Sequence, residues 1–418
     1  MINRLTLLTC CLFLLIGPAS AQDTVLRAAR MLDVDSGEIS GPVSLLISGD
    51  RITAINPNRT PSDATVVDLG DVTLLPGLMD MHTHLTFDLE GEWVHRDVTE
   101  TAIDSGLRGV RNAKRTLMAG FTTVRNVGAG GFAAVSLHKA IEQGFFPGPR
   151  IISAGHSLGI TGGHCDATGY QPGVMEKDWR HGIADGRDEV LKAVRYQIKH
   201  GAKVIKACAT AGVLSFEGPV GAQQYHQDEL EAIVEEAALH GIKVAGHAHG
   251  SEGILAAVKA GFASIEHGSM LTDEIINEMK ARGTYLVPTT YLVGAIDMDN
   301  LPAPIRAKAE FILPRAVASL QKAIREGVNI AFGTDAAVIP HGDNGKEFAA
   351  LVDRGMTPLQ AIQSATINAA DLLGVEDRGR LKAGLLADIV AVPGNPLDDV
   401  TALENVSFVM KGGMVYKH

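Results

Sequence analysis

The chain has 418 residues, of which 46% are apolar and 20% are charged, and it contains no low-complexity tract. This composition is typical of a soluble globular protein. The formal net charge of −11 argues against a nucleic acid as partner, because a polyanion would be repelled. The length exceeds that of one ordinary core and suits an α/β barrel with a small extra domain.

Residues 1–21 have the features of a signal peptide. Arg4 places a positive charge before the apolar residues 5–16, and Ala19-Ser20-Ala21 is a small-residue cleavage site. The apolar stretch, at about 12 residues, is too short to span a bilayer comfortably. We therefore expect a protein without a membrane anchor that is periplasmic or secreted after cleavage near Ala21.

Short strands separated by turns are predicted at both ends of the remaining chain. Gly49-Asp50 is a hairpin signal near the start, and the far end has the same pattern of short apolar runs and Gly or Pro turns. The expected strands are residues 43–48, 51–55, 65–69, 387–392, 406–411 and 414–416. We predict one small composite β-sandwich domain built from residues 22–75 and 382–418.

Between these ends, residues 76–381 repeat a pattern of strand followed by helix. Residues 187–200 and 228–240 have apolar side chains at helical spacing. The expected strands are residues 77–84, 122–127, 150–154, 203–209, 243–249, 264–268, 285–290 and 329–334. Eight such units predict an α/β fold of the (β/α)8 TIM-barrel type. The longest irregular connection, residues 156–186, is rich in glycine, as functional loops often are.

Polar residues gather where the predicted barrel strands end. His82 and His84 close the first strand, and their His-x-His spacing places both imidazoles on one face. Strand ends converge on one face of a barrel, so residues distant in sequence meet there. The further candidates are Lys206, His247, His267 and Asp335. A lone His in a strand is more often structural than a ligand, but this set together indicates a transition-metal site.

Lys206 lies in the apolar run Val204-Ile205-Lys206-Ala207, where an unpaired ammonium would be costly. Burial lowers the pKa of a lysine, and a neutral amine can capture carbon dioxide to become a carbamate. A carbamate is an anion with two oxygens and can bridge two cations. The alternative is a lysine paired with a carboxylate across the barrel.

Two cysteines, Cys165 and Cys208, lie beyond the signal segment, so no disulfide framework is expected. A single bridge between them stays open as an alternative. Their positions near the proposed site residues favour free thiols.

Several motifs resemble the metal-dependent amidohydrolase superfamily over essentially the whole chain after the signal segment. They are residues 75–80 before His82-Thr83-His84, the Lys206 strand, and residues 246–250, 265–268 and 333–336. Within that superfamily, residues 161–164, 340–344 and 361–370 resemble the bacterial prolidase-like branch. That branch includes Xaa-Lys, Xaa-Arg and Xaa-Pro dipeptidases or carboxypeptidases and ochratoxin hydrolases.

The resemblance implies two divalent metal ions, with zinc fitting the ligand types best. One ion would be held by His82, His84, Asp335 and a carbamate on Lys206, and the second by the same carbamate with the two remaining histidines, His247 and His267. Two ions can lower the pKa of a shared water towards about 7. Asp335 would then act as the catalytic proton shuttle.

The resemblance also places His164 in the glycine-rich loop where this branch carries a histidine, which makes it a candidate for contacting the substrate. His164 would bind the substrate's carboxylate or help to hold an oxyanion, with a loop-stabilising role as the alternative. His249, two residues beyond His247, would line the pocket from the same strand face, or support a ligand instead.

The leading functional hypothesis is hydrolysis of the amide bond to a C-terminal amino acid in a dipeptide or N-acyl amino acid, ochratoxin-type amides included. The alternatives are a cyclic amide hydrolase, a deaminase, and a non-catalytic scaffold relative. The mononuclear deaminase type lacks a bridging lysine, so Lys206 counts against it. The resemblance further implies a homo-oligomer in the form of an octamer.

Overall fold

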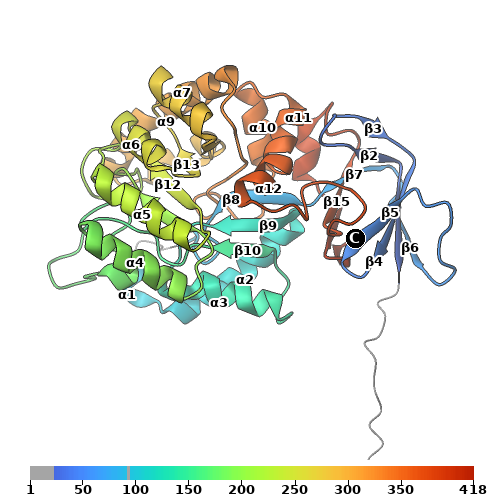
Figure 1. The fold of residues 1–418 in the computed structure, drawn as a ribbon, viewed down its shortest axis with the longest axis horizontal. Helices are drawn as coiled ribbons and strands as arrows, with labels where there is room; N and C mark the ends of the chain where they lie inside the picture. Colours follow the sequence, from blue (N-terminus) through green and yellow to red (C-terminus); the bar gives the residue numbers. More distant parts are fainter. Residues whose placement is uncertain (1–22, 92–94) are drawn as a thin grey trace, which may run out of the picture.

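The computed structural model describes residues 23–91 and 95–418. Strands from both ends of the chain lie together on one side of the molecule, and alternating strands and helices form the rest (Figure 1). The predicted signal peptide, residues 1–21, lies outside the described residues. Within the two described ranges, no helix combines the length and apolarity needed to cross a membrane.

The chain ends form two sheets. One consists of β1 (Thr24–Ala28), β4 (Val43–Ser48), β5 (Arg51–Ile55) and β6 (Thr65–Asp68). The other consists of β2 (Arg30–Leu32), β3 (Ile39–Ser40), β7 (Val72–Pro76), β15 (Ile389–Pro393), β16 (Phe408–Lys411) and β17 (Met414–Lys417). Their strand orders are β5-β4-β1-β6 and β17-β16-β15-β7-β2-β3. The second sheet therefore combines strands from both ends of the chain.

Apolar side chains of both sheets share one core. Along β4, Val43, Leu45 and Ile47 are buried and alternate with more accessible neighbours, as the period of two in a strand requires. They belong to one cluster with Leu74 and Phe408 of the other sheet. Each sheet thus covers the apolar face of the other.

Strand β7 leads directly into the first strand of the α/β part. It pairs antiparallel with β15, and Thr73 donates a hydrogen bond to the carbonyl of Gly394, 321 residues away in sequence. Gly77 forms the junction, and a Cβ there would overlap the side chain of Thr122. The amide of Gly77 donates to the carbonyl of Asp388 at 2.8 Å, so the junction is fixed from both sides.

The α/β part contains two parallel sheets with the strand orders β10-β9-β8 and β11-β12-β13-β14. Their strands are β8 (Leu78–Thr83), β9 (Phe121–Asn126), β10 (Arg150–Ser153), β11 (Ile205–Cys208), β12 (Val244–Ala248), β13 (Ser264–His267) and β14 (Tyr285–Val287). Seven of the eight predicted strands are thus present, each within a few residues of its expected range.

The eighth predicted strand, residues 329–334, is reduced to an isolated bridge between Ile330 and Leu286. Its backbone still bonds to both neighbours: Ala331 donates to Leu286 at 3.0 Å, and Asp335 donates to His82 at 2.8 Å. The residue that follows this segment, Asp335, has a φ of 58°, outside the extended region. At the other edge, the amide of Leu158 donates to the carbonyl of Lys206 at 2.7 Å, which connects the two parallel sheets.

Helices cover the outside of these strands (Figure 1). They are α1 (Arg96–Thr99), α2 (Ala102–Met118), α3 (Ala133–Glu142), α4 (Arg187–Lys199), α5 (Gln227–Leu239), α6 (Ser251–Ala260), α7 (Asp273–Arg282), α8 (Leu292–Ala295), α9 (Ala303–Glu326), α10 (Lys346–Asp353), α11 (Pro358–Ser364) and α12 (Ile367–Leu373). The predicted amphipathic stretches correspond to α4 and α5, where Val190, Val194, Leu230 and Ile233 are buried. This burial fixes the strands whose ends carry the candidate site.

Candidate active site

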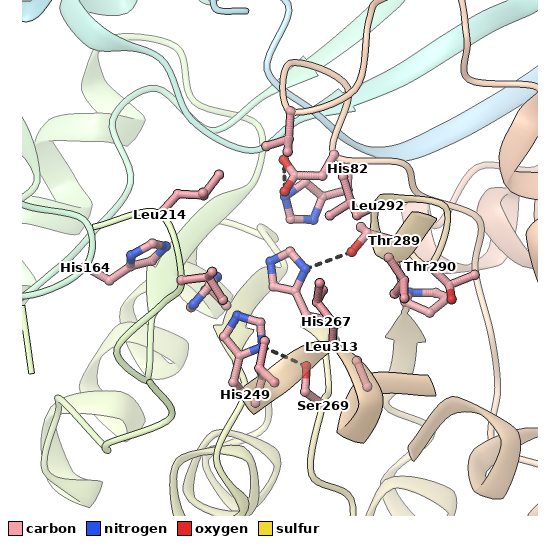
Figure 2. A pocket seen from close by; sticks show the side chains of 18 of the residues that line it. His82, His164, Leu214, His249, His267, Ser269, Thr289, Thr290, Leu292 and Leu313 are labelled. Atoms are coloured by element: carbon pink, nitrogen blue, oxygen red, sulfur yellow. Dashed lines mark hydrogen bonds and ion pairs between the residues drawn. The ribbon is translucent and has the colours of Figure 1, made fainter. Parts of the chain in front are cut away.

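One pocket collects all the side chains that the sequence singled out, at the carboxyl ends of the parallel strands. The space not filled by atoms is about 950 Å³ when the open mouth is counted with the pocket. Figure 2 shows the imidazoles of His82, His164, His249 and His267 facing this pocket. The predicted residues that line it are His82, His84, His164, Lys206, His247, His249, His267 and Asp335.

His82, His84 and Asp335 form the first of two clusters with potential metal-ligand atoms within 4.8 Å of one another. The Nε2 atoms of His82 and His84 each lie 3.5 Å from Oδ1 of Asp335. The Nδ1 of His84 is hydrogen-bonded to the carbonyl of Gly128 at 3.1 Å. That contact leaves Nε2 as the lone-pair donor towards the pocket.

His247, His249 and His267 form the second cluster. The Nδ1 of His267 lies 2.8 Å from the Thr289 hydroxyl, and that of His249 lies 2.7 Å from the Ser269 hydroxyl (Figure 2). The Nε2 of His247 is buried and has no hydrogen-bond partner among the described residues. A buried nitrogen without a partner is costly unless a ligand satisfies it, so this atom fits a metal ligand.

The two clusters adjoin each other. The ring centroids of His82 and His267 are 5.1 Å apart. His267 and Asp335 have φ values of 68° and 58°, a left-handed conformation that costs a non-glycine residue about 1–3 kcal/mol. Residues held in this way are concentrated at functional sites, where strain fixes the direction of a side chain.

Burial sets the protonation of these groups. It lowers the pKa of His84 to about 4 and that of His249 to about 3, and it holds the pKa of His82, His247 and His267 well below the ordinary value. All five imidazoles are therefore neutral at pH 7, which is the form that binds metals. Burial has the opposite effect on the carboxyl of Asp335 and raises its pKa to about 6.

Lys206 lies in the wall of the pocket at β11 and is only 4% exposed. Within residues 23–91 and 95–418, its ammonium has no hydrogen bond or ion pair, so the alternative of a partner carboxylate across the barrel is not observed. Burial lowers the pKa of Lys206 to about 8, against the attraction of Glu266 and Asp335. Roughly a tenth of this amine is therefore neutral at pH 7, far more than for an ordinary lysine.

Sequence reasoning missed Glu266, which is fully buried beside the site. Its Oε2 lies 2.7 Å from Nδ1 of His82, and its Oε1 accepts a hydrogen bond from Arg125 at 2.7 Å. Glu266 thereby turns Nε2 of His82 towards Asp335. The available signal was a carboxylate in the apolar strand before His267, which is costly unless it is paired.

The prediction that Cys165 and Cys208 are free thiols is wrong, because the two cysteines form a disulfide. Leu158, in the loop after β10, forms an isolated β-bridge with Ala207 of β11. This contact brings the loop next to β11. The two Cα atoms then lie 6.0 Å apart, within the range that a disulfide spans. The bridge fixes the loop that carries His164, whose ring lies 4.1 Å from that of His247.

Comparison with known proteins shows the family to which a chain with this site belongs. The profile of the Amidohydrolase family matches residues 73–416. Ochratoxinase from Aspergillus niger is 37% identical over 368 residues, which cover 82% of this chain and 75% of that protein. The chain belongs to the amidohydrolase family.

Solved structures place it within that family. A Xaa-Pro dipeptidase with methionine bound in its active site is 39% identical, with a TM-score of 0.91 over 95% of this chain and 100% of that one. The A. niger ochratoxinase structure is 34% identical, with a TM-score of 0.85 over 95% and 96%. A prolidase complexed with N-methylphosphonate-L-proline is 30% identical, with a TM-score of 0.88 over 95% and 100%.

This amidohydrolase is therefore a member of the prolidase-like branch and a hydrolase that acts on amide or peptide bonds. The family generally uses divalent metal ions, and the two histidine-rich clusters are candidate sites for them. Asp80 supports the first cluster, because it accepts hydrogen bonds from the amide of His82 at 3.0 Å and from the Thr334 hydroxyl at 2.6 Å. It thus holds the end of β8 against the segment that carries Asp335.

A large part of the pocket lining of this amidohydrolase is apolar. Leu292 and Leu313 face the pocket near His267 and Thr290, and Leu214 lies near His164 (Figure 2). The other apolar residues of the lining are Val213, Pro288, Val293, Ile296, Ile312, Ala316, Leu320 and Val338. Asp335 is the only carboxylate among the described residues that line the pocket.

Proposed function

We propose that this amidohydrolase binds two divalent metal ions, most suitably zinc, and hydrolyses the amide bond to a C-terminal amino acid in dipeptides or N-acyl amino acids. The observation that carries the proposal is the convergence of the six expected ligands on one pocket. His82, His84 and Asp335 would hold one ion, His247 and His267 would hold the other, and Lys206 would contribute to the site as its carbamate. The neutral imidazoles and the unpartnered Nε2 of His247 fit this role.

We also infer that the two parallel sheets form one closed (β/α)8 barrel. The backbone bonds of residues 331 and 335 to Leu286 and His82 support closure at one edge, and the bond from Leu158 to Lys206 supports it at the other. In such a barrel, the strand ends that carry the ligands surround one mouth.

Different residues of this chain have different roles in the proposed hydrolysis. Divalent ions supply an acidified water and a polarised scissile carbonyl. Asp335 accepts a proton from the attacking water and passes it to the leaving nitrogen. The neutral Nζ of Lys206 adds to carbon dioxide and loses a proton, which yields the anionic carbamate. His164, from the loop that follows β10, contacts the substrate's carboxylate or developing oxyanion, and His249 lines the same side of the pocket.

The apolar wall indicates the kind of substrate. A side chain that enters between Leu292 and Leu313 leaves water, and each square ångström of apolar surface removed from water contributes about 25 cal/mol. A lysine or arginine side chain of a substrate would have no carboxylate to pair with between Leu292 and Leu313 among the described lining residues. We therefore propose amides with a large apolar group, in line with the names of the ochratoxinase and Xaa-Pro dipeptidase relatives.

The test is a panel of dipeptides and N-acyl amino acids varied at the C-terminal residue, combined with metal analysis. We expect hydrolysis of apolar members and close to two ions per chain. Fully active enzyme with one ion would contradict the dinuclear site, and a panel without any turnover would contradict the substrate class.

Substitution of Lys206 tests the carbamate. Lys206→Ala is expected to abolish turnover, and short carboxylic acids are expected to restore part of it. The matched control is Lys203→Ala, because Lys203 is exposed just before the same strand and should retain full activity. Unchanged activity in Lys206→Ala would reject the role of Lys206.

We further propose that the protein is exported. The disulfide between Cys165 and Cys208 supports this, because such bonds persist mainly in oxidising compartments. Cell fractionation of the producing organism would test it, and recovery of the whole chain from the cytoplasm would contradict it.

A further inference from the structure

His164 lies in a loop, but its imidazole contacts several neighbouring residues that restrict its orientation. Its ring lies against that of His247, with centroids 4.1 Å apart and an angle of 32° between the planes. The backbone of Gly212 also lies against this ring, and a Cβ there would overlap three of its atoms. The absence of a side chain at residue 212 therefore makes room for this imidazole.

The edge of the same ring is also held. Nδ1 of His164 lies 2.5 Å from the Ser215 hydroxyl and 3.5 Å from Oε1 of Glu217. Its backbone amide donates to the side chain of Gln224 at 3.1 Å. With Nδ1 engaged, Nε2 is the nitrogen that remains available to a bound ligand.

Glu217 is itself fixed, although it lies in a loop. Its side chain is only 5% exposed and accepts a hydrogen bond from the amide of Gly212 at 2.9 Å. Burial raises the pKa of Glu217, but its hydrogen bonds with His164 and Ser215 outweigh burial and lower the pKa to about 2. Glu217 is thus an anion at neutral pH and can only accept a hydrogen bond.

Lys308 on α9 connects this loop to the apolar wall. Its ammonium donates to the carbonyls of Ser215 at 2.9 Å and Glu217 at 2.8 Å, and it lies 3.8 Å from Oε2 of Glu217. The same helix contributes Leu313 to the pocket lining. The loop that orients His164 is therefore tied to the helix that would contact the substrate's apolar group.

We propose that Glu217 is a positioning residue, which together with Ser215 holds Nδ1 of His164 and leaves Nε2 facing the bound substrate. A histidine whose Nδ1 is held by a hydroxyl and a carboxylate has one defined tautomer and one ring orientation. The inference rests on the proposed function only where His164 is said to contact the substrate. The positioning itself is a property of the free protein.

The experiment is a double-mutant cycle between His164→Ala and Glu217→Gln, with kcat and KM measured on the best substrate of the panel. Glu217→Gln is expected to lower kcat/KM by about 10- to 100-fold, as is usual for a residue that orients a functional histidine. In the His164→Ala background the same change should cost nothing further, because the group through which it acts is gone. Equal losses in both backgrounds would overturn the proposal.

A second measurement does not depend on turnover. In protein labelled with ¹⁵N-histidine, the His164 signal, assigned by its loss in His164→Ala, should report the Nδ1–H tautomer in the wild type. Glu217→Gln and Gly212→Ala should each shift that signal, the first by removing the acceptor charge and the second by displacing the ring. An unshifted signal in Glu217→Gln would overturn the proposal even if the enzyme's substrate were unknown.

The matched control is Glu236→Gln on α5, another carboxylate with 5% side-chain exposure, which pairs with Arg195. It should leave both kcat/KM and the His164 signal unchanged. If His164→Ala retains full activity while Glu217→Gln still shifts the signal, the positioning stands and only the substrate contact of His164 fails.

Discussion

Oε2 of Glu266 lies 2.7 Å from Nδ1 of His82, at a point where both side chains are almost completely buried. The other carboxylate oxygen accepts a hydrogen bond from Arg125 at 2.7 Å. Glu266 therefore balances a buried cation and at the same time fixes the direction of the His82 imidazole, a proposed metal ligand. Partners of this kind raise the basicity of the ligand that they hold.

Glu266→Gln should lower both stability and metal content. Loss of the charge leaves Arg125 unpaired in the interior, which costs about 3–5 kcal/mol in unfolding free energy. Urea unfolding and elemental analysis would measure the two effects. The double variant Arg125→Met Glu266→Gln should recover part of the stability but not the metal. Full metal content in Glu266→Gln would contradict the role of Glu266.

Leu313→Asp should change the substrate preference. A charge in the apolar wall removes the burial of an apolar substrate group, and one such contact is worth about 1.5–3 kcal/mol, or roughly 10- to 100-fold in kcat/KM. The loss should be largest for substrates with phenylalanine or leucine next to the scissile bond. Phe311→Asp is the control, because Phe311 lies on the same helix and is 44% exposed. Equal effects of both changes would argue against an apolar subsite.

The double variant Cys165→Ala Cys208→Ala should be less stable than the wild type. The bridge closes a loop across 43 residues, which corresponds to about 4 kcal/mol of unfolded-state entropy at 25 °C. Guanidinium unfolding would measure the loss, and wild-type protein with a thiol reductant should behave like the variant. An identical midpoint with and without reductant would show that the bridge does not stabilise the fold.

Glu347 should make stability fall as pH rises from about 5 to 8. Burial raises its pKa to about 8, although the amides of Thr290 and Tyr291 donate to its carboxylate. In this interval the folded protein keeps a proton that the unfolded chain has lost, so each increase in pH favours unfolding. Glu347→Gln cannot titrate and should flatten this part of the curve of Tm against pH. A variant with the same slope as the wild type would refute the assignment.

The sequence identifies side chains that converge on one pocket because its signals are local. The spacing of His82 and His84 follows from the period of a strand, and the other candidates stand at the ends of apolar runs. Glu266 and the disulfide were missed because they depend on long-range contacts: Arg125 lies 141 residues from Glu266. The eighth predicted strand is reduced to a bridge between Ile330 and Leu286, a departure that apolar periodicity does not encode.

The pairing of β7 with β15 has a consequence for biosynthesis. Thr73 is synthesised long before Gly394, which follows 321 residues later. Leu74 and Leu75 of β7 can therefore pair with β15 only when translation is almost complete. The strand that runs into His82 gains its flanking partner at the very end. A chain that ends before Ile389 would lack the β15 partner of β7, the strand that leads into β8 and His82.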